Sequence, residues 1–271
     1  MSCTGKPGLL RGKVLSEVTV GGLIPVTRSF IYYVPESLDP NKGVPLIISP
    51  HGFGMTAEDM FTLTGFREVA DREGLVAIFP DGSPVAPWNV GTGASGIGAN
   101  VNNILADDQG FFDAIIAFAS ADQCVDAKHM FVSGFSMGGY LSNEVDCLRS
   151  DIAGVGAHSA GSHDLSQCPG SIKPVILFHG DADLVIGYKD NGELARDRWV
   201  TRNGCTQVAE ARPVKGGTCE YYRGCPAHAQ VALCRFDGMA HLWAGGSGLH
   251  GDPSRESAAD LAWSFWRQYA W

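Results

Sequence analysis

Residues 130–140 read Met-Phe-Val-Ser-Gly-Phe-Ser-Met-Gly-Gly-Tyr, and they give the clearest single indication of the fold. Its first half is a run of β-forming residues, two glycines flank Ser136, and a helical pattern follows over residues 138–149. A strand, a sharp turn and a helix in that order are typical of a nucleophile elbow, which presents a serine hydroxyl at the N-terminus of a helix. The short motif alone is weak evidence, because the chain holds 35 glycines and residues 157–161 nearly match it too.

Ser136 needs two partners to act as a nucleophile. A histidine must take its proton, and a carboxylate must orient that histidine. After an elbow of this kind the chain order is serine, acid, histidine. His241 follows a strand-like run, and Asp181 and Asp183 follow the buried run 175–178. Because α/β active sites form at the carboxyl edge of the sheet, we predict a triad of Ser136, His241 and one of these two acids.

Two further histidines are alternative bases. His158 and His163 follow the strand-like run 152–155, so both could lie at the same edge of the sheet. A lone histidine in a loop is usually a polar surface residue, but both remain formally possible bases. The sequence nevertheless favours His241.

The oxyanion of a tetrahedral intermediate needs two backbone N–H donors. Met137, the residue after the nucleophile, is expected to supply one of them. The other is expected from residues 50–54, Pro-His-Gly-Phe-Gly, which follow the strand-like run 46–49. Phe53 is the candidate donor in that loop, and a simple glycine turn is the alternative interpretation.

The rest of the chain alternates between strand and helix patterns. Two β-rich stretches open it, at 14–20 and 26–34, and are expected to pair antiparallel. Buried strands are expected at 46–49, 75–79, 130–133, 152–155 and 175–178, and helices at 57–72, 109–122, 138–149, 191–203 and 255–269. This alternation predicts a mostly parallel central sheet flanked by helices. Together with the nucleophile elbow and the order of the triad candidates, it predicts an α/β-hydrolase fold in a single catalytic domain spanning residues 1–271. Residues 81–103 are expected to form a long functional loop, and residues 204–234 a hairpin stapled by disulfides.

Composition narrows the function classes. The net charge is −9 without a cluster of Lys and Arg, so a nucleic-acid partner is not expected. The longest apolar stretch, residues 111–119, is too short to span a bilayer, so no membrane partner is expected. No metal-binding spacing of Cys and His occurs, and no metal or other cofactor is expected. The chemistry is expected to come from the side chains and backbone groups of the protein itself.

Eight cysteines favour a disulfide framework and hence a secreted protein, with reduced buried thiols as the alternative. Cys219 and Cys234 lie on the two arms of the expected hairpin, where cross-strand pairing is geometrically reasonable. Cys205 would then pair with Cys225 and Cys147 with Cys168, which leaves Cys3 for Cys124. The start of the chain lacks an apolar leader, and we expect that a leader was removed and Met1 added for expression.

Six motifs together resemble a known family. They are HGFG at 51–54, PDG at 80–82 with Trp88 and Asn89 following, DDQGFFDAI at 107–115, GFSMGGY at 134–140, HGDADLVIGY at 179–188 and GMAHLW at 238–243. In this order they resemble the polyhydroxybutyrate-depolymerase-like esterases, which include the feruloyl esterases of carbohydrate esterase family 1. The resemblance covers residues 25–270 and implies that Asp183 is the triad acid and that ester hydrolysis needs no metal.

Two features depart from the pattern of that family. Ala244 follows Trp243, where the family often has proline. Four cysteines between residues 205 and 234 exceed the usual pair, which suggests an extra bridge.

The combined expectation is a serine carboxylic-ester hydrolase that works through an acyl-enzyme. Feruloyl or other hydroxycinnamoyl esters of plant cell-wall polysaccharide are the favoured substrates, followed by polyhydroxyalkanoates and acetylated xylan. An acyltransferase and a non-catalytic binding module are more distant alternatives. Trp88, Asn89 and Trp243 are the candidate substrate-binding residues, because an aromatic ring stacks on a phenolic or sugar ring. Packing beneath loops is the alternative role of both tryptophans.

Overall fold

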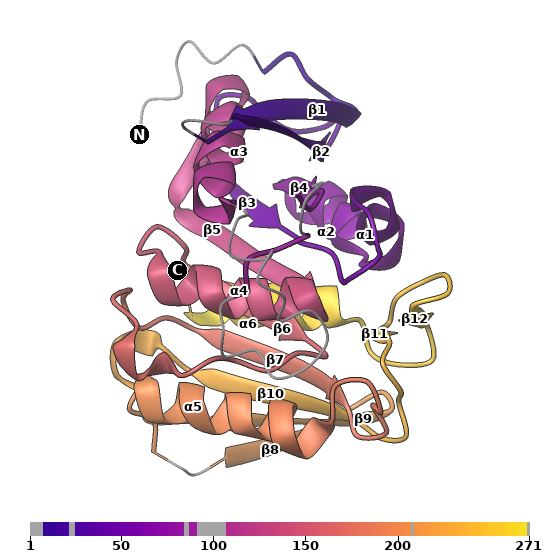
Figure 1. Ribbon diagram of the computed structural model, residues 1–271, viewed down its shortest axis with the longest axis vertical. Helices are drawn as coiled ribbons and strands as arrows, with labels where there is room; N and C mark the ends of the chain where they lie inside the picture. The colour runs from indigo at the N-terminus through magenta and orange to yellow at the C-terminus, as the bar shows by residue number, and fades with distance from the viewer. Residues whose placement is uncertain (1–7, 22–24, 84–86, 91–106, 207–208, 270–271) are drawn as a thin grey trace.

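The computed structural model describes residues 8–21, 25–83, 87–90, 107–206 and 209–269. Their centre is a ten-stranded sheet with the order β1-β2-β4-β3-β5-β6-β7-β10-β9-β8 (Figure 1). Its strands are β1 (Gly12–Val20), β2 (Val26–Val34), β3 (Val44–Ile48), β4 (Val76–Pro80), β5 (Val125–Phe135), β6 (Gly154–His158), β7 (Val175–Gly180), β8 (Ala209–Val214), β9 (Gly217–Tyr222) and β10 (Val231–Phe236). A separate two-stranded ribbon pairs β11 (Trp243–Ala244) with β12 (Gly251–Asp252).

The strands from β4 to β10 in this order run parallel, and the strands at both edges are antiparallel. β4, β3, β5, β6, β7 and β10 form the parallel part. β1 and β2 extend it antiparallel on one side, and the hairpin of β8 and β9 does so on the other. The predicted α/β-hydrolase fold with a mostly parallel central sheet is therefore confirmed, and the carboxyl ends of six strands meet at one edge.

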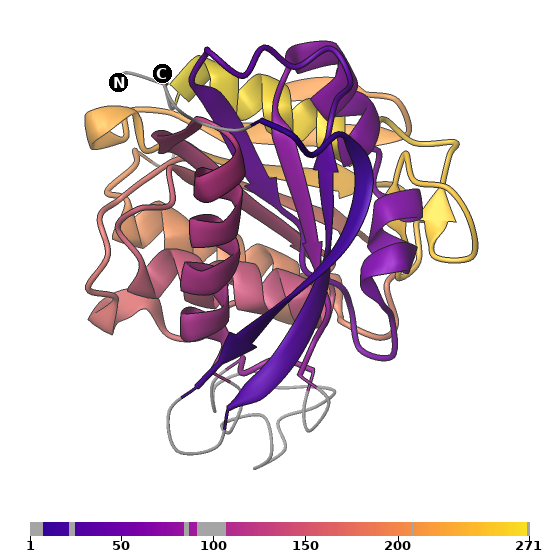
Figure 2. The same ribbon diagram turned by 90° about the horizontal axis from the view of Figure 1, so that it is seen from above.

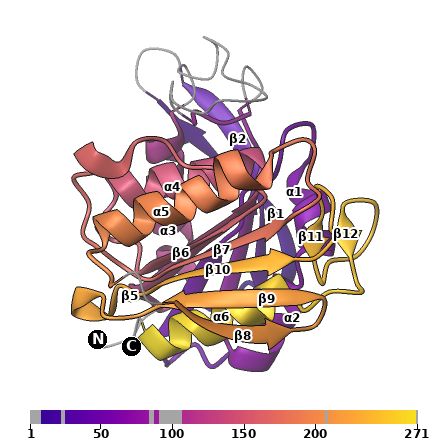
Figure 3. The same ribbon diagram turned by 90° about the horizontal axis from the view of Figure 1, so that it is seen from below.

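Helices cover both faces of the sheet, as Figure 2 and Figure 3 show from opposite sides. One face carries α3 (Asp108–Asp122), α4 (Met137–Leu148) and α5 (Leu194–Arg202). The other carries α1 (Ala57–Leu63), α2 (Phe66–Glu73) and α6 (Ala258–Tyr269). Short helical turns complete the described chain: η2 (Leu165–Gln167), η3 (Tyr188–Glu193) and η4 (Pro226–His228).

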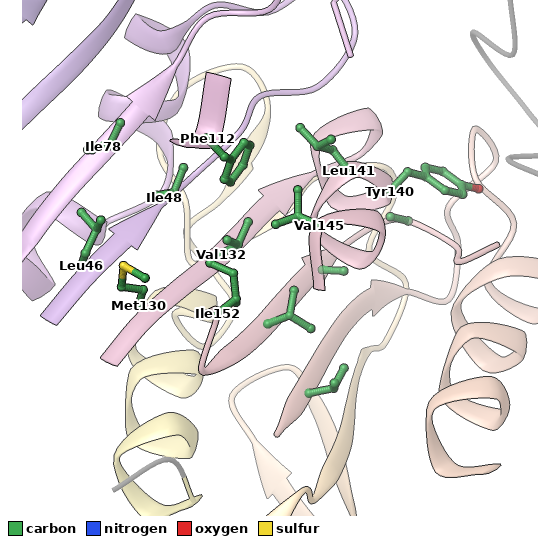
Figure 4. Close-up of a cluster of buried hydrophobic side chains, with 14 of the residues drawn as sticks. Leu46, Ile48, Ile78, Phe112, Met130, Val132, Tyr140, Leu141, Val145 and Ile152 are labelled. Atoms are coloured by element: carbon green, nitrogen blue, oxygen red, sulfur yellow. The ribbon is translucent and has the colours of Figure 1, made fainter. Parts of the chain in front are cut away.

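The two layers of helices create two hydrophobic cores, one on each side of the sheet. Leu46 and Ile48 of β3 point to the core that holds Phe112 and Leu141 (Figure 4). Ile47, between them in the chain, belongs to the opposite core. Successive side chains of a strand face opposite ways, so a strand buried on both faces reads as a continuous apolar run. This explains why the short apolar runs of the sequence located the parallel strands.

The helix expected at 57–72 is wrong as a single element. The chain forms α1 and α2 instead, because Gly65 between them has a left-handed backbone with φ 80°. Thr56 caps α1: its hydroxyl accepts the N–H of Asp59, whose carboxylate accepts the N–H of Thr56. Such a reciprocal pair satisfies two N–H groups that a helix start otherwise leaves open.

Asp107 and Asp108, which stand next to each other at the start of α3, have different roles. Asp107 caps α3 by accepting the N–H of Gly110. Asp108 is buried and lies 2.6 Å from a guanidinium nitrogen of Arg28 on β2. It also accepts the N–H of Asn89 at 2.5 Å. The second acid therefore joins the start of α3 to the edge strand and to the segment that carries Asn89.

Three of the four predicted disulfides are confirmed, joining Cys147 to Cys168, Cys205 to Cys225 and Cys219 to Cys234. Cys219 and Cys234 are direct partners in the antiparallel register of β9 and β10. Cys124 is disulfide-bonded too, whereas its predicted partner Cys3 lies outside the described residues. No cysteine in the described part of the chain is free.

Candidate active site

Ser136 sits between the end of β5 and the start of α4. Its backbone angles, φ 53° and ψ −117°, lie in a region that a residue with a side chain adopts only when its surroundings impose it. The surroundings are tight: a Cβ on Gly134 would lie 2.2 Å from the carbonyl oxygen of Gly138. A Cβ on Gly138 would lie 2.1 Å from the carbonyl oxygen of Pro50. Both glycines are therefore required, and their close packing holds the serine in the strained turn of a nucleophile elbow.

Asp183 and His241 form a close pair at the same edge of the sheet. Nδ1 of His241 lies 2.7 Å from Oδ2 of Asp183, and the second carboxylate oxygen accepts the N–H groups of Val185 and Ile186 at 2.9 Å each. His241 and Ser136 line one pocket of about 130 Å³. The structure thus brings the three predicted triad residues together in the chain order serine, acid, histidine.

The environment of Asp183 keeps its carboxyl group ionised. Burial by itself would raise the pKa of Asp183, but hydrogen bonds from His179, His241 and the N–H of Ile186 hold that pKa well below its usual range. His179 donates mainly to the carbonyl oxygen of Ile186 at 2.7 Å, and its Nε2 lies 3.5 Å from Asp183. A fixed negative charge behind His241 stabilises the imidazolium that forms when the ring takes a proton.

The alternative acid and bases have other partners. Asp181 accepts the N–H of Gly238 at 2.7 Å and holds the turn after β10. The ring of His163 pairs with Glu144 at 2.9 Å. His158 is completely buried, and its Nε2 accepts the N–H of Ala244 at 2.9 Å. Burial lowers the pKa of His158 well below its usual value, so the ring stays neutral.

His158 nevertheless supports the site through its backbone and its ring. Its carbonyl oxygen accepts the N–H of Ser136 at 2.8 Å, while its ring holds Ala244, three residues after His241. Trp243 stacks on that ring with the centroids 4.8 Å apart. One residue therefore connects the segment of the nucleophile to the segment of the base.

The two predicted oxyanion donors flank the nucleophile. Phe53 and Met137 line the same pocket as Ser136. Neither N–H donates to a protein acceptor among the described residues, which leaves both available to an oxyanion. Met137 is the first residue of α4, so its N–H also has the positive end of the helix dipole behind it.

His51 orients the Phe53 donor, a role that the sequence reasoning missed. Nε2 of His51 accepts the N–H of Gly82 at 2.9 Å, so Nδ1 carries the proton and donates to the carbonyl oxygen of Gly52 at 2.7 Å. The carbonyl of Gly52 and the N–H of Phe53 belong to one trans peptide and point in opposite directions. The Phe53 N–H is thereby directed away from His51. Burial lowers the pKa of His51, which keeps the ring neutral and this arrangement intact.

The histidines that support the site did leave a signal in the sequence. His51 and His179 each stand directly before a glycine at the end of a buried strand, in HGFG and HGDADLVIGY. A buried histidine at a strand end must satisfy both ring nitrogens, and the neighbouring loop carbonyls are the nearest acceptors.

The prediction that Trp88 and Trp243 stack on a substrate is wrong. Both side chains are 0% exposed, and a ring without exposed surface offers no face to a ligand. Trp88 packs on His51 and donates its indole N–H to the carbonyl oxygen of that residue at 2.8 Å. Asn89 is half-buried next to it, and its substrate contact stays a prediction. Residues 84–86 and 91–103 of the expected loop lie outside the described residues.

One cluster of the described residues has the composition of a metal site but not its chemistry. Cys147, His163 and Cys168 offer ligand atoms within 4.8 Å of one another. The two sulfurs are joined in a disulfide, and a metal requires the thiolate form of cysteine.

In the described part of the chain, no helix is long and apolar enough to cross a membrane.

The fold and the geometry define the class of protein. A strained serine at an elbow, a histidine in the same pocket and a buried carboxylate behind that histidine are the arrangement of an α/β-hydrolase that cleaves carboxylic esters.

Known proteins define the family. No family model matches the chain. Feruloyl esterase D of Neurospora crassa is 30% identical over 230 residues, which cover 82% of this chain and 75% of that protein. The chain therefore belongs to the feruloyl esterase family. Feruloyl esterase B of Piromyces equi is 28% identical, and the match covers 90% of this chain but 45% of the relative, so the chain spans less than half of that protein.

Solved structures agree on the fold. Acetyl xylan esterase from Aspergillus awamori superimposes with a TM-score of 0.65 at 16% identity, covering 93% of this chain and 99% of the other. A carbohydrate esterase family 1 ferulic acid esterase from Anaeromyces mucronatus, in complex with ferulic acid, superimposes with a TM-score of 0.54 at 17% identity, covering 87% of each chain.

Proposed function

We propose that the protein is a secreted serine esterase that cleaves feruloyl or related hydroxycinnamoyl esters of plant cell-wall polysaccharide. The observation that carries the proposal is the single pocket that contains both Ser136 and His241. The walls of that pocket include the apolar side chains of Phe53, Val185 and Ile186, which suit an aromatic acyl group. The names of the relatives that share most of this chain support the same substrate class.

The proposed reaction proceeds in two halves. Ser136 Oγ attacks the ester carbonyl while His241 takes the hydroxyl proton, and Asp183 stabilises the imidazolium. The N–H groups of Phe53 and Met137 bind the oxyanion; losing one such donor costs about 3 kcal/mol in the barrier. The C–O bond then breaks, and the alcohol leaves with the proton from His241. Water, deprotonated by His241, attacks the acyl-enzyme, releases the acid and restores Ser136.

Acetylated xylan is the second candidate substrate. The pocket beside the nucleophile measures about 130 Å³, which is ample for an acetyl group. The acetyl xylan esterase among the solved structures also superimposes over nearly the whole chain.

Relative rates test the proposal. Purified protein is given methyl ferulate, acetylated xylan and polyhydroxybutyrate, and released ferulate, acetate and hydroxybutyrate are quantified. We expect the highest kcat/KM with methyl ferulate, and Ser136→Ala as the matched control should abolish release from every substrate while leaving the melting temperature near that of the wild type. Release of acetate or hydroxybutyrate without any release of ferulate would refute the hydroxycinnamoyl assignment.

Secretion is supported by the disulfides, since such bonds persist in oxidising compartments. Thiol titration of protein isolated from its natural source tests this part of the proposal. We expect no reactive thiol without a reductant, and a full set of free thiols would contradict an extracellular location.

A further inference from the structure

Two hollows continue from the nucleophile pocket along the protein surface. Tyr140 lines the nucleophile pocket and also a hollow of about 50 Å³, together with Gly161, Ser162 and Asn191. Arg198 lines this small hollow and a larger one of about 380 Å³. Shared lining residues therefore connect three depressions in a row, and we call the two hollows beyond the nucleophile pocket the α5 groove.

The α5 groove differs in chemistry from the nucleophile pocket. Its larger part lies between η2 and α5, where charged and hydroxyl side chains stand beside the apolar Leu165 and the carbon atoms of their own stems: Asp164, Ser166, Asp197, Arg198, Thr201 and Arg202. The nucleophile pocket, by contrast, has Phe53, Val185 and Ile186 among its walls. An ester that joins an aromatic acid to a polar alcohol matches this division into an apolar and a polar part.

Polar groups at the start of the groove are positioned for a ligand. Tyr140 belongs to the buried cluster, but its hydroxyl points away from the other side chains (Figure 4) and donates to Asn191 Oδ1 at 2.8 Å. Ser162 is 5% exposed, and its buried hydroxyl has no hydrogen-bond partner among the described residues. A buried hydroxyl without a partner is unfavourable until a ligand or water supplies one. Arg198, whose guanidinium donates to the carbonyl oxygen of Ser162, is fixed beside it.

Gly161 keeps the small hollow open. A Cβ at this position would lie 2.9 Å from Asn191 Oδ1 and 3.0 Å from the hydroxyl oxygen of Tyr140. Any larger residue would therefore push into the polar groups that line the hollow. Leu194, 41% exposed on the same wall, adds an apolar surface of the kind on which the C–H face of a sugar ring packs.

We propose that the α5 groove binds the carbohydrate on the alcohol side of the ester. This inference rests on the proposed function and adds the part of the substrate that the triad does not touch. Neighbouring hydroxyl groups of a sugar both donate and accept hydrogen bonds, which suits a surface that offers guanidinium, carboxylate and hydroxyl groups side by side. An oligosaccharide is therefore the ligand expected.

A pair of substrates with the same acyl group tests the groove. Methyl ferulate reaches only the nucleophile pocket, whereas a feruloylated pentose oligosaccharide also reaches the groove. In Arg198→Gln we expect KM for the oligosaccharide ester to rise about tenfold, because charge-assisted hydrogen bonds are lost, with KM for methyl ferulate within twofold of the wild type. Arg212→Gln is the matched control: it makes the same change of residue type on β8, where Arg212 pairs with Glu210, and neither of these residues lines either hollow.

Binding separates failure of the groove from failure of the proposed function. The oligosaccharide without its ester is titrated into wild-type protein and into Arg198→Gln by calorimetry. Weaker binding to the variant supports the groove even if no feruloyl ester is cleaved. Equal losses on both esters, or unchanged KM and binding, would overturn the groove while leaving the esterase activity in place. If Arg198→Gln does not fold, Asp197→Asn replaces it, because this exposed residue lines the same hollow. The same changes in KM and in binding would then support or overturn the groove.

Discussion

Replacing Asp183 by asparagine tests the assignment of the triad acid most directly. The carboxylate accepts from His241 through one oxygen and from two backbone N–H groups through the other. An asparagine can keep its oxygen on the backbone N–H groups, and its NH₂ group then faces Nδ1 of His241. Because an NH₂ group only donates, the imidazole must present Nδ1 as an acceptor and carry its proton on Nε2. A ring in that tautomer cannot take the proton of Ser136.

The expected loss in kcat follows from this change in the tautomer of His241. We expect Asp183→Asn to lower kcat by about 10³–10⁴-fold, which corresponds to roughly 4–5.5 kcal/mol in the activation free energy. Hydrolysis of p-nitrophenyl acetate measures it, with a burst of p-nitrophenol reporting acylation. Asp181→Asn is the matched control, since Asp181 holds the N–H of Gly238, and its kcat should fall less than about tenfold. A larger loss in Asp181→Asn than in Asp183→Asn would refute the assignment.

Stability supplies a second measurement on the same variants. The pKa of Asp183 is lower in the folded protein than in the unfolded chain, so this group stabilises the fold above the unfolded pKa of about 4 and loses that contribution as the pH falls through the acid range. The difference in unfolding free energy between the wild type and Asp183→Asn should therefore be largest at neutral pH and shrink below about pH 4. A difference that is constant with pH would argue against an ionised Asp183.

Three further predictions follow from buried groups. Trp88→Ala should lower the free energy of unfolding by about 3–5 kcal/mol and reduce kcat/KM equally for methyl ferulate and a short acetyl ester; a selective loss on ferulate would restore the stacking role. The double variant Cys219→Ala and Cys234→Ala should lose about 3 kcal/mol in urea unfolding, and an unchanged midpoint would contradict a structural disulfide. Burial raises the pKa of Asp108 to about 6 despite Arg28, so the folded state binds this proton more tightly than the unfolded state does. This group should make the unfolding free energy fall as the pH rises from about 4 to 6, and Asp108→Asn should remove that component of the pH slope.

The three triad residues could be predicted from the sequence because their meeting point depends only on the topology of the sheet. Ser136, Asp183 and His241 each follow a buried strand, and parallel strands bring their carboxyl ends to one edge whatever the details of the loops. The choice between Asp181 and Asp183 could not be made from the residues alone. Two residues apart after the same strand, they differ only in the direction that the turn gives each side chain.

The depth of a side chain is harder to read from sequence than its place along the chain. Trp88 lies in a polar, glycine-rich segment, which suggested an exposed ring. The ring is buried because Arg28 and His51, from distant parts of the chain, cover it. Gly65 likewise divides an apparently continuous helix, because a left-handed residue interrupts the hydrogen-bond ladder while the apolar pattern continues across it.

The crowding around Ser136 has a consequence for protein engineering. Gly134 and Gly138 leave no room for even one methyl group, so a mutant library that includes these positions would consist mostly of misfolded members. The outward side chains of α5 are under no such restriction, since Leu194, Asp197 and Thr201 are exposed. A library restricted to that helix would vary affinity for the alcohol half of the ester while the machinery that breaks the bond stays constant, which makes α5 the economical place to begin directed evolution.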